Sequence, residues 1–495
     1  MQFGIAEAVE HWSRYRPRNV AIYSNDRIIT YRSLNDTANK LCNFLLKQKI
    51  SEPRIGIALS SKYNFIVSLL SILKMGKSVT VINTGLPDQS IAINIRDTCT
   101  NAVIVEQNMK NKIPSENVNL IDFPQDNELK EFSNNFKLIN RFPSDEWGIL
   151  FSSGTTGIPK GIERDHNSIV TELLGWCIEL NLNKRTSFYI GRPVYYTGGL
   201  VLALSTLLVC GSVILNDYND YNNPLQVWND YQKYLHHNPI TWSFFVPDQI
   251  RIFLKDIMSS IKTPLGSESI LTMGSPITGE EKKETVKYLN SNIVESWGNS
   301  ESLGTITDPE DVHIRPNSIG RPFLTDEMYI VNDDGNLLEP NEYGRIAGGE
   351  EAGFLQYSNR PHETNRVKKS HLIISDDIGY MDNSGYLYLC GRRQDLIVTS
   401  DGNIFLPELE TKLRRIKGIY ECSIVAKTQE DGSFFLYLFL VCSSDKTSVK
   451  EQINNQIKTI LDDHEKIDKC FFVSELPRVP SGKVDKIKLL ELIEK

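Results

Sequence analysis

The sequence lacks any hydrophobic run long enough to cross a membrane. Its most apolar stretch, LVLALSTLLVCGSVIL (200–215), is shorter than the ~20 residues that a spanning helix needs, and Gly211 interrupts it. We therefore predict a buried helix, a glycine stop and a buried strand here. The start, MQFGIAEAVEHW, carries acidic residues and no long apolar core, so we expect neither a secretory signal nor a membrane partner.

The sequence also lacks an excess of basic residues and any pair of clustered cysteines. It holds 54 Lys and Arg against 62 Asp and Glu, and this net charge of -8 disfavours a general nucleic-acid binder. The eight cysteines are scattered without a CxxC pair, which favours reduced thiols in a cytoplasmic protein. Internal repeats and low-complexity tracts are absent as well. We expect a globular cytoplasmic protein without a nucleic-acid partner.

Strand-like and helix-like apolar runs alternate in the first part of the 495-residue chain. In order, they are RIGIAL as a strand, NFIVSLLSILKMG as a helix ended by Gly76, and SVTVI and NAVIVEQ as further strands. Such alternation predicts an α/β fold, in which helices cover parallel sheets. Sheets of this kind bind ligands at the carboxyl ends of their strands.

After residue 320, hairpin-like and strand-like segments replace the alternation of strands and helices. MYIVNDDGNLLEP predicts a hairpin with a DG turn and YGRIAGG a further strand, which we assign to a small barrel-like β subdomain. The end of the chain reads as a compact α+β unit. We place the boundary at GRRQD (391–395), which gives a large domain over 1–392 and a small domain over 393–495.

The segment FSSGTTGIPKG (151–161) combines glycines, hydroxyl side chains and one lysine after a predicted strand. Glycines let backbone N–H groups approach a polyphosphate, and Lys160 supplies a positive charge. The Walker pattern requires Ser or Thr after its Gly-Lys pair, whereas here Pro159 precedes Lys160 and Gly161 follows. The segment fits neither GxGxxG nor a GxSxG nucleophile elbow. It predicts a phosphate-binding loop of another kind.

SSGTTGIPKG resembles the signature loop of the adenylate-forming superfamily, which includes acyl- and aryl-CoA synthetases, adenylation domains of peptide synthetases, and luciferases. Further segments resemble the motifs of this superfamily in the expected order: LTMGSPITGEE, ESWGNSE, YGRIAGG, SDDIGYMDNSGYLYLCGRRQD, NIFLPELE and LPRVPSGKVDK. The resemblance spans nearly the whole chain. It implies a large AMP-binding domain followed by a small, mobile C-terminal domain that closes over the site.

The resemblance implies that a carboxylate attacks the α-phosphorus of ATP, giving acyl-AMP and pyrophosphate. Because both reactants are anions, neutralising charge is the main catalytic need. By the resemblance, Lys160 holds the β- and γ-phosphates, Glu301 binds Mg²⁺, and Lys483 bridges carboxylate and α-phosphate in the transition state. The implied cofactors are ATP and Mg²⁺.

The same motifs assign the rest of the nucleotide site. Trp297, where tyrosine is usual, is assigned to stack on adenine, and Asp377 to contact the ribose. Arg392 is assigned to reach the ribose or a phosphate. Asp376 replaces the usual glycine beside Asp377, which leaves open which of these acids binds. The full set of predicted ATP-binding residues is Ser152, Ser153, Gly154, Thr155, Thr156, Gly157, Lys160, Gly274, Ser275, Pro276, Ser296, Trp297, Gly298, Ser300, Asp377, Arg392 and Lys483.

The acyl side is assigned from PVYYTGG (193–199). Domains that activate α-amino acids place an aspartate in the matching segment, where this chain has Tyr195 and Tyr196. A buried amine without a counter-ion is costly, so we expect a simple carboxylic acid as substrate. The predicted acyl pocket comprises Tyr196, Gly199, Phe245, Met273 and Gly274. Gln394 stands where the superfamily usually has the Asp or Lys of the interdomain hinge.

The sequence leaves two candidate thiols as acceptors of the acyl group: the phosphopantetheine of a carrier protein and coenzyme A. SGKVDK resembles the last loop of carrier-loading domains, which favours the phosphopantetheine of a separate carrier protein. Ligation to coenzyme A is the alternative, because many CoA synthetases share the remaining motifs. A non-catalytic nucleotide-binding protein is a third reading, but it predicts the loss of Lys160, Glu301 or Lys483, and all three are present.

Overall fold

The computed structural model describes most of the chain, in two compact units. One unit comprises Met1–Met328 with Ala347–Ile373, and the other comprises Tyr329–Ile346 with Ile374–Lys495. The predicted boundary at 392/393 falls inside the second unit and stays a prediction. The described residues are 3–25, 27–114, 117–152, 159–215, 223–235, 240–259, 267–289, 291–301, 303–349, 353–369, 371–399, 402–428, 434–442, 447–462, 465–478 and 484–493.

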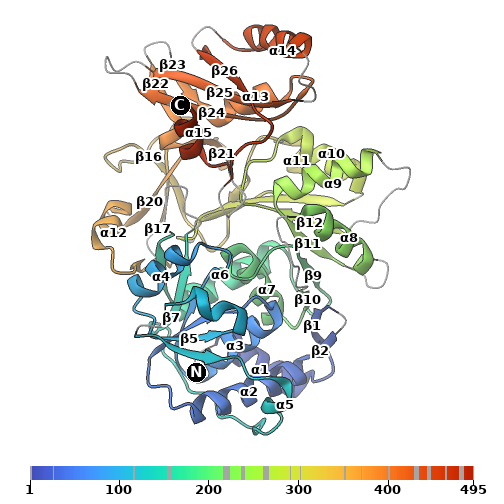
Figure 1. Ribbon diagram of the computed structural model, residues 1–495, viewed down its shortest axis with the longest axis vertical. Helices are drawn as coiled ribbons and strands as arrows, with labels where there is room; N and C mark the ends of the chain where they lie inside the picture. The colour runs from blue at the N-terminus through green and yellow to red at the C-terminus, as the bar shows by residue number, and fades with distance from the viewer. Residues whose placement is uncertain are drawn as a thin grey trace. The chain divides into compact units, whose positions relative to one another are not determined.

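The first unit contains two mainly parallel sheets (Figure 1). The order of the nine-stranded sheet is β15 (Arg321–Pro322), β14 (Gly304–Ile306), β13 (Asn292–Gly298), β12 (Ser269–Thr272), β11 (Trp242–Phe245), β9 (Ser187–Ile190), β10 (Ser212–Ile214), β1 (Val20–Ser24) and β2 (Arg27–Thr30). The order of the seven-stranded sheet is β18 (Gln356–Tyr357), β8 (Gly161–Asp165), β7 (Glu146–Phe151), β4 (Ser78–Val81), β3 (Arg54–Ala58), β5 (Ala102–Val105) and β6 (Asn119–Asp122).

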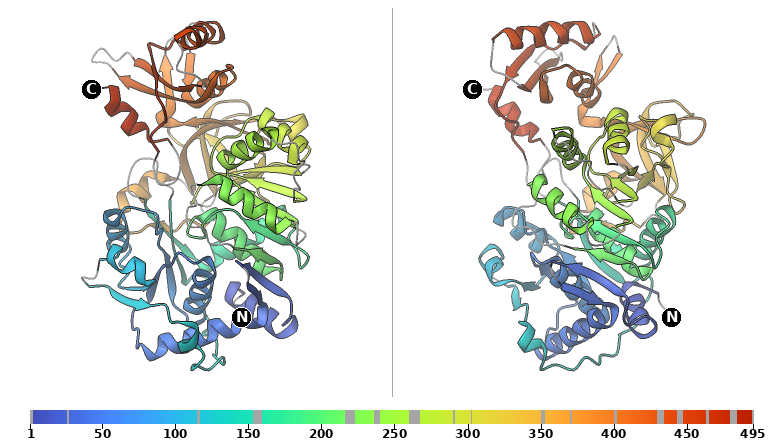
Figure 2. Two further views of the ribbon diagram at one scale, coloured as in Figure 1. Left: turned by 45° about the vertical axis from the view of Figure 1, so that its right-hand side comes forward. Right: turned by 90° about the vertical axis from the view of Figure 1, so that its right-hand side faces the viewer.

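Helices cover both sheets of the first unit. Apolar side chains of both sheets join one core with those of α1 (Ile5–Tyr15), α2 (Tyr31–Lys47), α3 (Lys62–Lys74), α6 (His166–Glu179) and α7 (Thr197–Leu208). On the other face of the nine-stranded sheet, a second core includes α8 (Pro224–Leu235), α9 (Pro247–Ser259) and α10 (Gly279–Leu289). Figure 2 shows these green helices stacked against strands of similar colour. Smaller helices are α4 (Asp88–Asp97), α5 (Asp126–Leu129), α11 (Asp311–Ile314) and α12 (Pro361–Val367).

Several predicted elements are confirmed here. The apolar run 200–215 forms most of the buried helix α7 and the strand β10, with Gly211 between them. The expected stop after α3 lies at Gly76, whose φ of 66° favours glycine. Within the described ranges, none of the helices combines the length and hydropathy that crossing a bilayer requires. All eight cysteines are free thiols.

The second unit opens with a five-stranded sheet in the order β16 (Met328–Val331), β17 (Gly344–Gly349), β20 (Leu372–Met381) and β19 (Lys368–Lys369), with β21 (Leu387–Arg392) also paired to β20. The β19–β20 and β20–β21 pairs are antiparallel. The described strands of this sheet do not close on themselves. A small β subdomain is therefore present as expected, but it is an open sheet and not a barrel. Next come η3 (Arg393–Asp395), the hairpin β22 (Leu396–Thr399) and β23 (Gly402–Phe405), and α13 (Leu406–Arg414).

The end of the second unit is the expected α+β module. A three-stranded sheet of β24 (Ile419–Thr428), β25 (Phe434–Cys442) and β26 (Lys469–Phe472) shares a core with α13 and α14 (Thr447–Ile460). The last helix, α15 (Lys486–Ile493), packs Leu489 against β24 and β25. The predicted α/β class, with helix-covered parallel sheets and a terminal α+β part, is confirmed.

Candidate active site

Predicted site residues gather at one edge of the nine-stranded sheet. Strands β9, β11, β12 and β13 run parallel to one another, so their carboxyl ends meet at the same edge. The segment 191–199 follows β9, the segment 273–276 follows β12, and the segment 297–301 covers the last two residues of β13 and the three that follow it. The chain therefore brings the predicted acyl, adenine and metal residues of the first unit to one side of this sheet.

The ends of the glycine-rich loop are held by a β-hairpin. Strands β7 and β8 pair antiparallel, with Phe151 opposite Gly161. The Ser152 backbone N–H donates to the Lys160 carbonyl at 3.0 Å, and the Lys160 N–H donates to the Ser152 Oγ at 3.1 Å. The predicted residues Ser153, Gly154, Thr155, Thr156 and Gly157 lie outside the described residues. The hairpin thus places Lys160 at a defined point beside the start of the loop.

Lys160 and Glu301 meet at one tyrosine. The Lys160 ammonium lies 4.7 Å from the centre of the Tyr357 ring, and the Tyr357 hydroxyl donates to Glu301 Oε1 at 2.5 Å. Pairing of β18 with β8 sets Tyr357 opposite Ile162, two residues after Lys160. The two predicted catalytic residues of the first unit are therefore brought together.

The sequence analysis missed Tyr357. A single tyrosine in the segment FLQYSN carries no recognisable signal, because its position depends on the pairing of β18 with β8, nearly two hundred residues earlier in the chain. A search for short strands that extend the edge of the predicted sheet could have pointed to it.

Glu301 fits a magnesium site of the kind that phosphates complete. The described residues contain no group of three or more His, Cys, Asp or Glu side chains able to hold a metal ion. Mg²⁺ typically binds one or two carboxylates together with substrate phosphates and keeps several waters. Glu301 is half-buried, and Tyr357 donates to one of its two oxygens, which leaves Oε2 for a cation.

The segment after β12, residues 273–276, has free space beside Gly274 and is anchored at its far end. Gly274 has φ of 102°, and a Cβ there would meet just one neighbouring atom, Val246 Cγ1 at 3.9 Å. Thr278 and Glu281 cap α10 reciprocally, each side chain accepting from the other residue's N–H. The Pro276 carbonyl accepts from Arg251 at 2.7 Å, so that Ser275 and Pro276 lie between two fixed points.

The end of β13 carries the predicted adenine-stacking residue. Trp297 is half-buried and lies opposite Thr305 of β14, while its neighbour Ser296 is buried. Gly298 is exposed and Ser300 is half-buried. The end of the strand and the turn after it therefore leave Trp297, Gly298 and Ser300 partly accessible, and Ser296 is less available to a ligand.

The predicted acyl residues divide between two faces of the sheet. A Cβ on Gly198 would lie 3.0 Å from Met273 Sδ and 3.7 Å from Phe244 Cζ, so these three residues adjoin. Phe245 is fully buried on the other face, with its ring centre 5.0 Å from that of Phe253. The structure does not bring Phe245 to Met273, because side chains alternate along β11 and Phe244 takes that face. Gly199 lies against the Pro193 carbonyl.

The two tyrosines of PVYYTGG have different partners. The Tyr195 hydroxyl bonds to the Thr84 side chain, and burial raises the pKa of Tyr195 well above its usual range. The Tyr196 ring has the Arg192 guanidinium over it, 5.1 Å from its centre. Tyr196 is half-buried, as Arg192 and Met273 are.

In the second unit, Asp377 and Arg392 lie opposite each other on β20 and β21. Arg392 Nε lies 3.4 Å from Asp377 Oδ1, and Asp377 is nine-tenths buried. The adjacent Asp376 pairs instead with Arg345, at 3.1 Å. Two neighbouring acids thus have separate cationic partners, and Asp377 is the one beside the other predicted ribose residue.

Two predicted residues of the second unit have no described side chain. Lys483 lies outside the described residues. Gln394 belongs to η3, and its side chain is outside the described part. Their roles in catalysis and in the hinge stay predictions.

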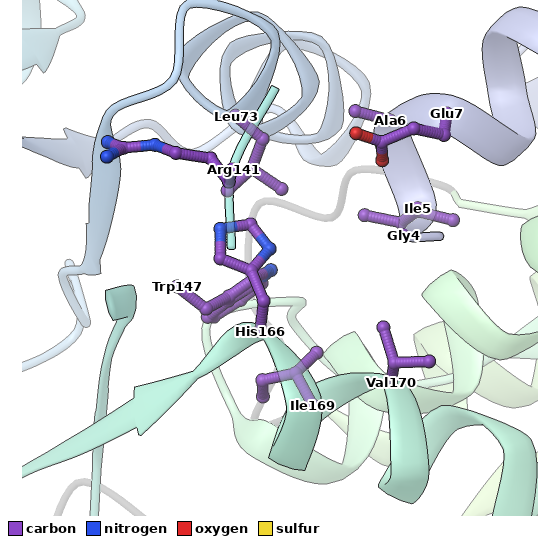
Figure 3. Close-up of a pocket in the computed structure, with 10 residues that line it drawn as sticks. All are labelled: Gly4, Ile5, Ala6, Glu7, Leu73, Arg141, Trp147, His166, Ile169 and Val170. Carbon is purple, nitrogen blue, oxygen red and sulfur yellow. The ribbon is translucent and has the colours of Figure 1, made fainter. Parts of the chain in front are cut away.

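A separate cavity lies in the first unit at the start of α1 (Figure 3). The imidazole of His166 points into it, between Arg141 and Trp147. The buried His166 Nε2 has no hydrogen-bond partner among the described atoms, and burial together with Arg141 lowers the pKa of His166 to about 4. None of the predicted site residues lines this cavity, which is formed by Gly4, Ile5, Ala6, Glu7, Leu73, Arg141, Trp147, His166, Ile169 and Val170.

Known proteins resemble the chain over nearly its whole length. The 2-succinylbenzoate–CoA ligase of Oceanobacillus iheyensis is 23% identical over 97% of this chain and 98% of that protein. The long-chain-fatty-acid–CoA ligase FadD13 of Mycobacterium tuberculosis is 22% identical over 94% of each chain. The structure of Bacillus subtilis O-succinylbenzoate coenzyme A synthetase in complex with ATP and magnesium ion has a TM-score of 0.84 at 20% identity, covering 98% of this chain and 99% of that one.

A family model described as AMP-binding enzyme matches residues 9–357. The match contains the glycine-rich loop, Glu301 and Tyr357, and it covers well over half of the chain. The chain therefore belongs to the AMP-binding enzyme family, within the adenylate-forming superfamily that its motifs resemble.

Proposed function

We propose that this AMP-forming ligase joins a carboxylic acid to coenzyme A through an acyl adenylate. The observation that carries the first step is the meeting of Lys160 and Glu301 at Tyr357. A cation and a carboxylate at the end of a glycine-rich loop suit a bound polyphosphate with its metal ion.

The chain's own residues then have distinct tasks. Lys160 and the loop hydroxyls hold the leaving pyrophosphate, and the Tyr357 hydroxyl orients the Glu301 carboxylate. When bound at Glu301, Mg²⁺ supplies positive charge to the phosphate oxygens. We assign the ribose to Asp377 and Arg392. Lys483 neutralises the attacking carboxylate and the α-phosphate in the transition state, a task worth on the order of 10²–10³ in rate.

Coenzyme A is the acceptor that the comparisons support better than a carrier protein. The relatives described above are named CoA ligases or synthetases and match this chain along nearly its whole length. The sequence favoured a carrier because of the letters VDK after Lys483.

These letters have a local structural explanation. Asp485 accepts from the Lys488 N–H at 3.1 Å and so caps α15, and Lys486 pairs with Asp395 at 2.8 Å. Val484 packs into the last core. The VDK letters therefore have structural roles of their own, which weakens them as a signal for the acceptor.

The test is an acid-dependent ATP–pyrophosphate exchange assay over a panel of carboxylic acids, followed by thioester formation with coenzyme A. We expect exchange with one class of acid, and consumption of coenzyme A in step with AMP release. Exchange without thioester formation would redirect the second step to a carrier protein. Absence of exchange with every acid, under conditions where ATP binds, would exclude the proposed adenylation.

A further inference from the structure

We propose that Arg192 binds a second anionic group on the substrate, so that the acid activated by this enzyme is a dicarboxylic acid. The proposal rests on the adenylation proposed above and names its substrate class. It makes Arg192 a specificity-determining residue, which none of the sequence motifs assigned.

Arg192 lies where an acid substrate has to be recognised. It follows β9 at the edge where the carboxyl ends of the parallel strands meet, and it begins the turn that leads to α7. Its guanidinium lies over the ring of Tyr196, a predicted acyl residue. Gly198, two residues after Tyr196, adjoins Met273 and Phe244. The same turn thus offers an apolar surface and a cation.

The cation is half-buried and has no ion pair within the described part of the chain. Comparable arginines of the first unit are paired: Arg54 with Glu146 at 2.6 Å, Arg251 with Glu281 at 2.6 Å, and Arg360 with Asp97 at 2.9 Å. Removing a guanidinium from water without an anion is unfavourable, and an aromatic face compensates it only in part. Arg192 therefore differs from these arginines, and an anion on the ligand would supply the partner that it lacks within the described part of the chain.

A carboxylate is the anion that suits this position. The guanidinium offers donors in a planar fork that matches a carboxylate, and its contact with the Tyr196 ring places it beside a predicted acyl residue. The start of α7 adds partial positive charge through its helix dipole, and its N-cap, Tyr196, makes no side-chain capping bond to the first N–H groups. Met273 and Phe244 favour an apolar spacer between this carboxylate and the one that is activated. The implied substrate has two carboxylates separated by an aliphatic or aromatic linker.

The experiment compares dicarboxylic acids with their half-amides in ATP–pyrophosphate exchange, from succinic to sebacic acid together with phthalic and homophthalic acids. A half-amide keeps one reactive carboxyl group and nearly the same shape, and it loses the second charge. We expect kcat/KM for the best diacid to exceed that for its half-amide by about 10²-fold, because a site built for a bidentate pair rejects the partner that lacks it.

Three variants test whether the preference for the diacid over its half-amide depends on Arg192. Arg192→Gln is expected to lower kcat/KM for the diacid by about 10²-fold, mainly through KM, and so to abolish the preference over the half-amide. Arg192→Lys keeps the charge without the fork and is expected to keep part of the preference. Arg185→Gln removes an exposed arginine just before the other end of β9 and is the matched control, expected to keep the full preference.

The outcomes separate this inference from the proposed function. Efficient exchange with monocarboxylic acids alone, or equal losses for diacid and half-amide in Arg192→Gln, would overturn the dicarboxylate assignment and leave adenylation intact. A raised KM for coenzyme A in Arg192→Gln, with unchanged diacid kinetics, would assign Arg192 to the acceptor and overturn the inference as well. Absence of exchange with every acid would overturn the proposed function itself.

Discussion

The two units differ in how the cationic side chains in and near the candidate site are compensated. In the first unit, Lys160 and Arg192 lie over tyrosine rings. In the second unit, Arg392 and Lys486 lie beside the carboxylates of Asp377 and Asp395. An aromatic face holds a cation in place while leaving its charge available, whereas a carboxylate largely neutralises it. We infer that Lys160 and Arg192 keep their charge available for an anionic ligand, whereas Arg392 and Lys486 are compensated by carboxylates of their own unit.

The sharpest test of this contrast removes the charge of Lys160. Lys160→Met is expected to lower acid-dependent pyrophosphate exchange by about 10²–10³-fold, because Lys160 lies at the end of the loop, where it can neutralise phosphate charge. Lys287→Met is the matched control, since Lys287 also lies over a tyrosine ring, that of Tyr288, but on the exposed face of α10. Similar losses in both variants would mean that stacking on tyrosine, and not the ligand charge, explains the effect.

A second test concerns His166, which is buried in the first unit with an unpartnered ring nitrogen. Burial, assisted by Arg141, lowers its pKa from 6.5 to about 4, so the folded state favours the neutral ring. The stability that this provides is complete above pH 6.5 and is lost as the pH falls toward 4, by at most about 3 kcal/mol. Urea unfolding at several pH values measures it.

His166→Gln should flatten this pH dependence, whereas His11→Gln, which removes an exposed histidine of α1, should leave it unchanged. An unaltered slope in His166→Gln would show that other groups cause the acid sensitivity.

The third test breaks an ion pair in the second unit. Lys486→Met leaves Asp395 without its cation and removes charge near the half-buried Glu410, which should destabilise the unit by about 1–3 kcal/mol. Lys488→Met is the matched control on the same helix, because Lys488 is exposed and its contact with Asp485 is worth under about 1 kcal/mol. Equal urea midpoints for the two variants would remove the structural role assigned to Lys486.

The smallest expected effect separates the two contacts of Tyr357. Tyr357→Phe keeps the ring beneath Lys160 and removes the hydroxyl that donates to Glu301. We expect the Mg²⁺ concentration for half-maximal exchange to rise about tenfold, since partners of metal ligands contribute at least this much. Tyr288→Phe, next to Lys287, is the control. A Mg²⁺ dependence unchanged in Tyr357→Phe would contradict the role of this hydroxyl in orienting Glu301.

The sequence was informative wherever a function leaves a local pattern. Alternating apolar runs predicted the parallel sheets, and the glycine-rich segment with its following motifs pointed to the family. Tyr357 and Arg192 were not predicted from the sequence, because their contacts form only when the sheets are assembled. Phe245 was preferred to Phe244 for the acyl side, although the two faces of β11 cannot be told apart without knowing which core each contacts. The open β-sheet, expected to be barrel-like, depends on strand pairings that hairpin signals do not specify.

The pairing of β18 with β8 bears on how this protein could be shortened. A fragment that ends before Gln356 would keep the entire glycine-rich loop and Glu301, yet it would lose Tyr357 and the edge strand that holds it. Such a fragment would leave the N–H and C=O groups of β8 exposed along a free edge, which invites association with other chains. A minimal nucleotide-binding fragment, or a split protein for complementation assays, should therefore retain residues through the strand that carries Tyr357.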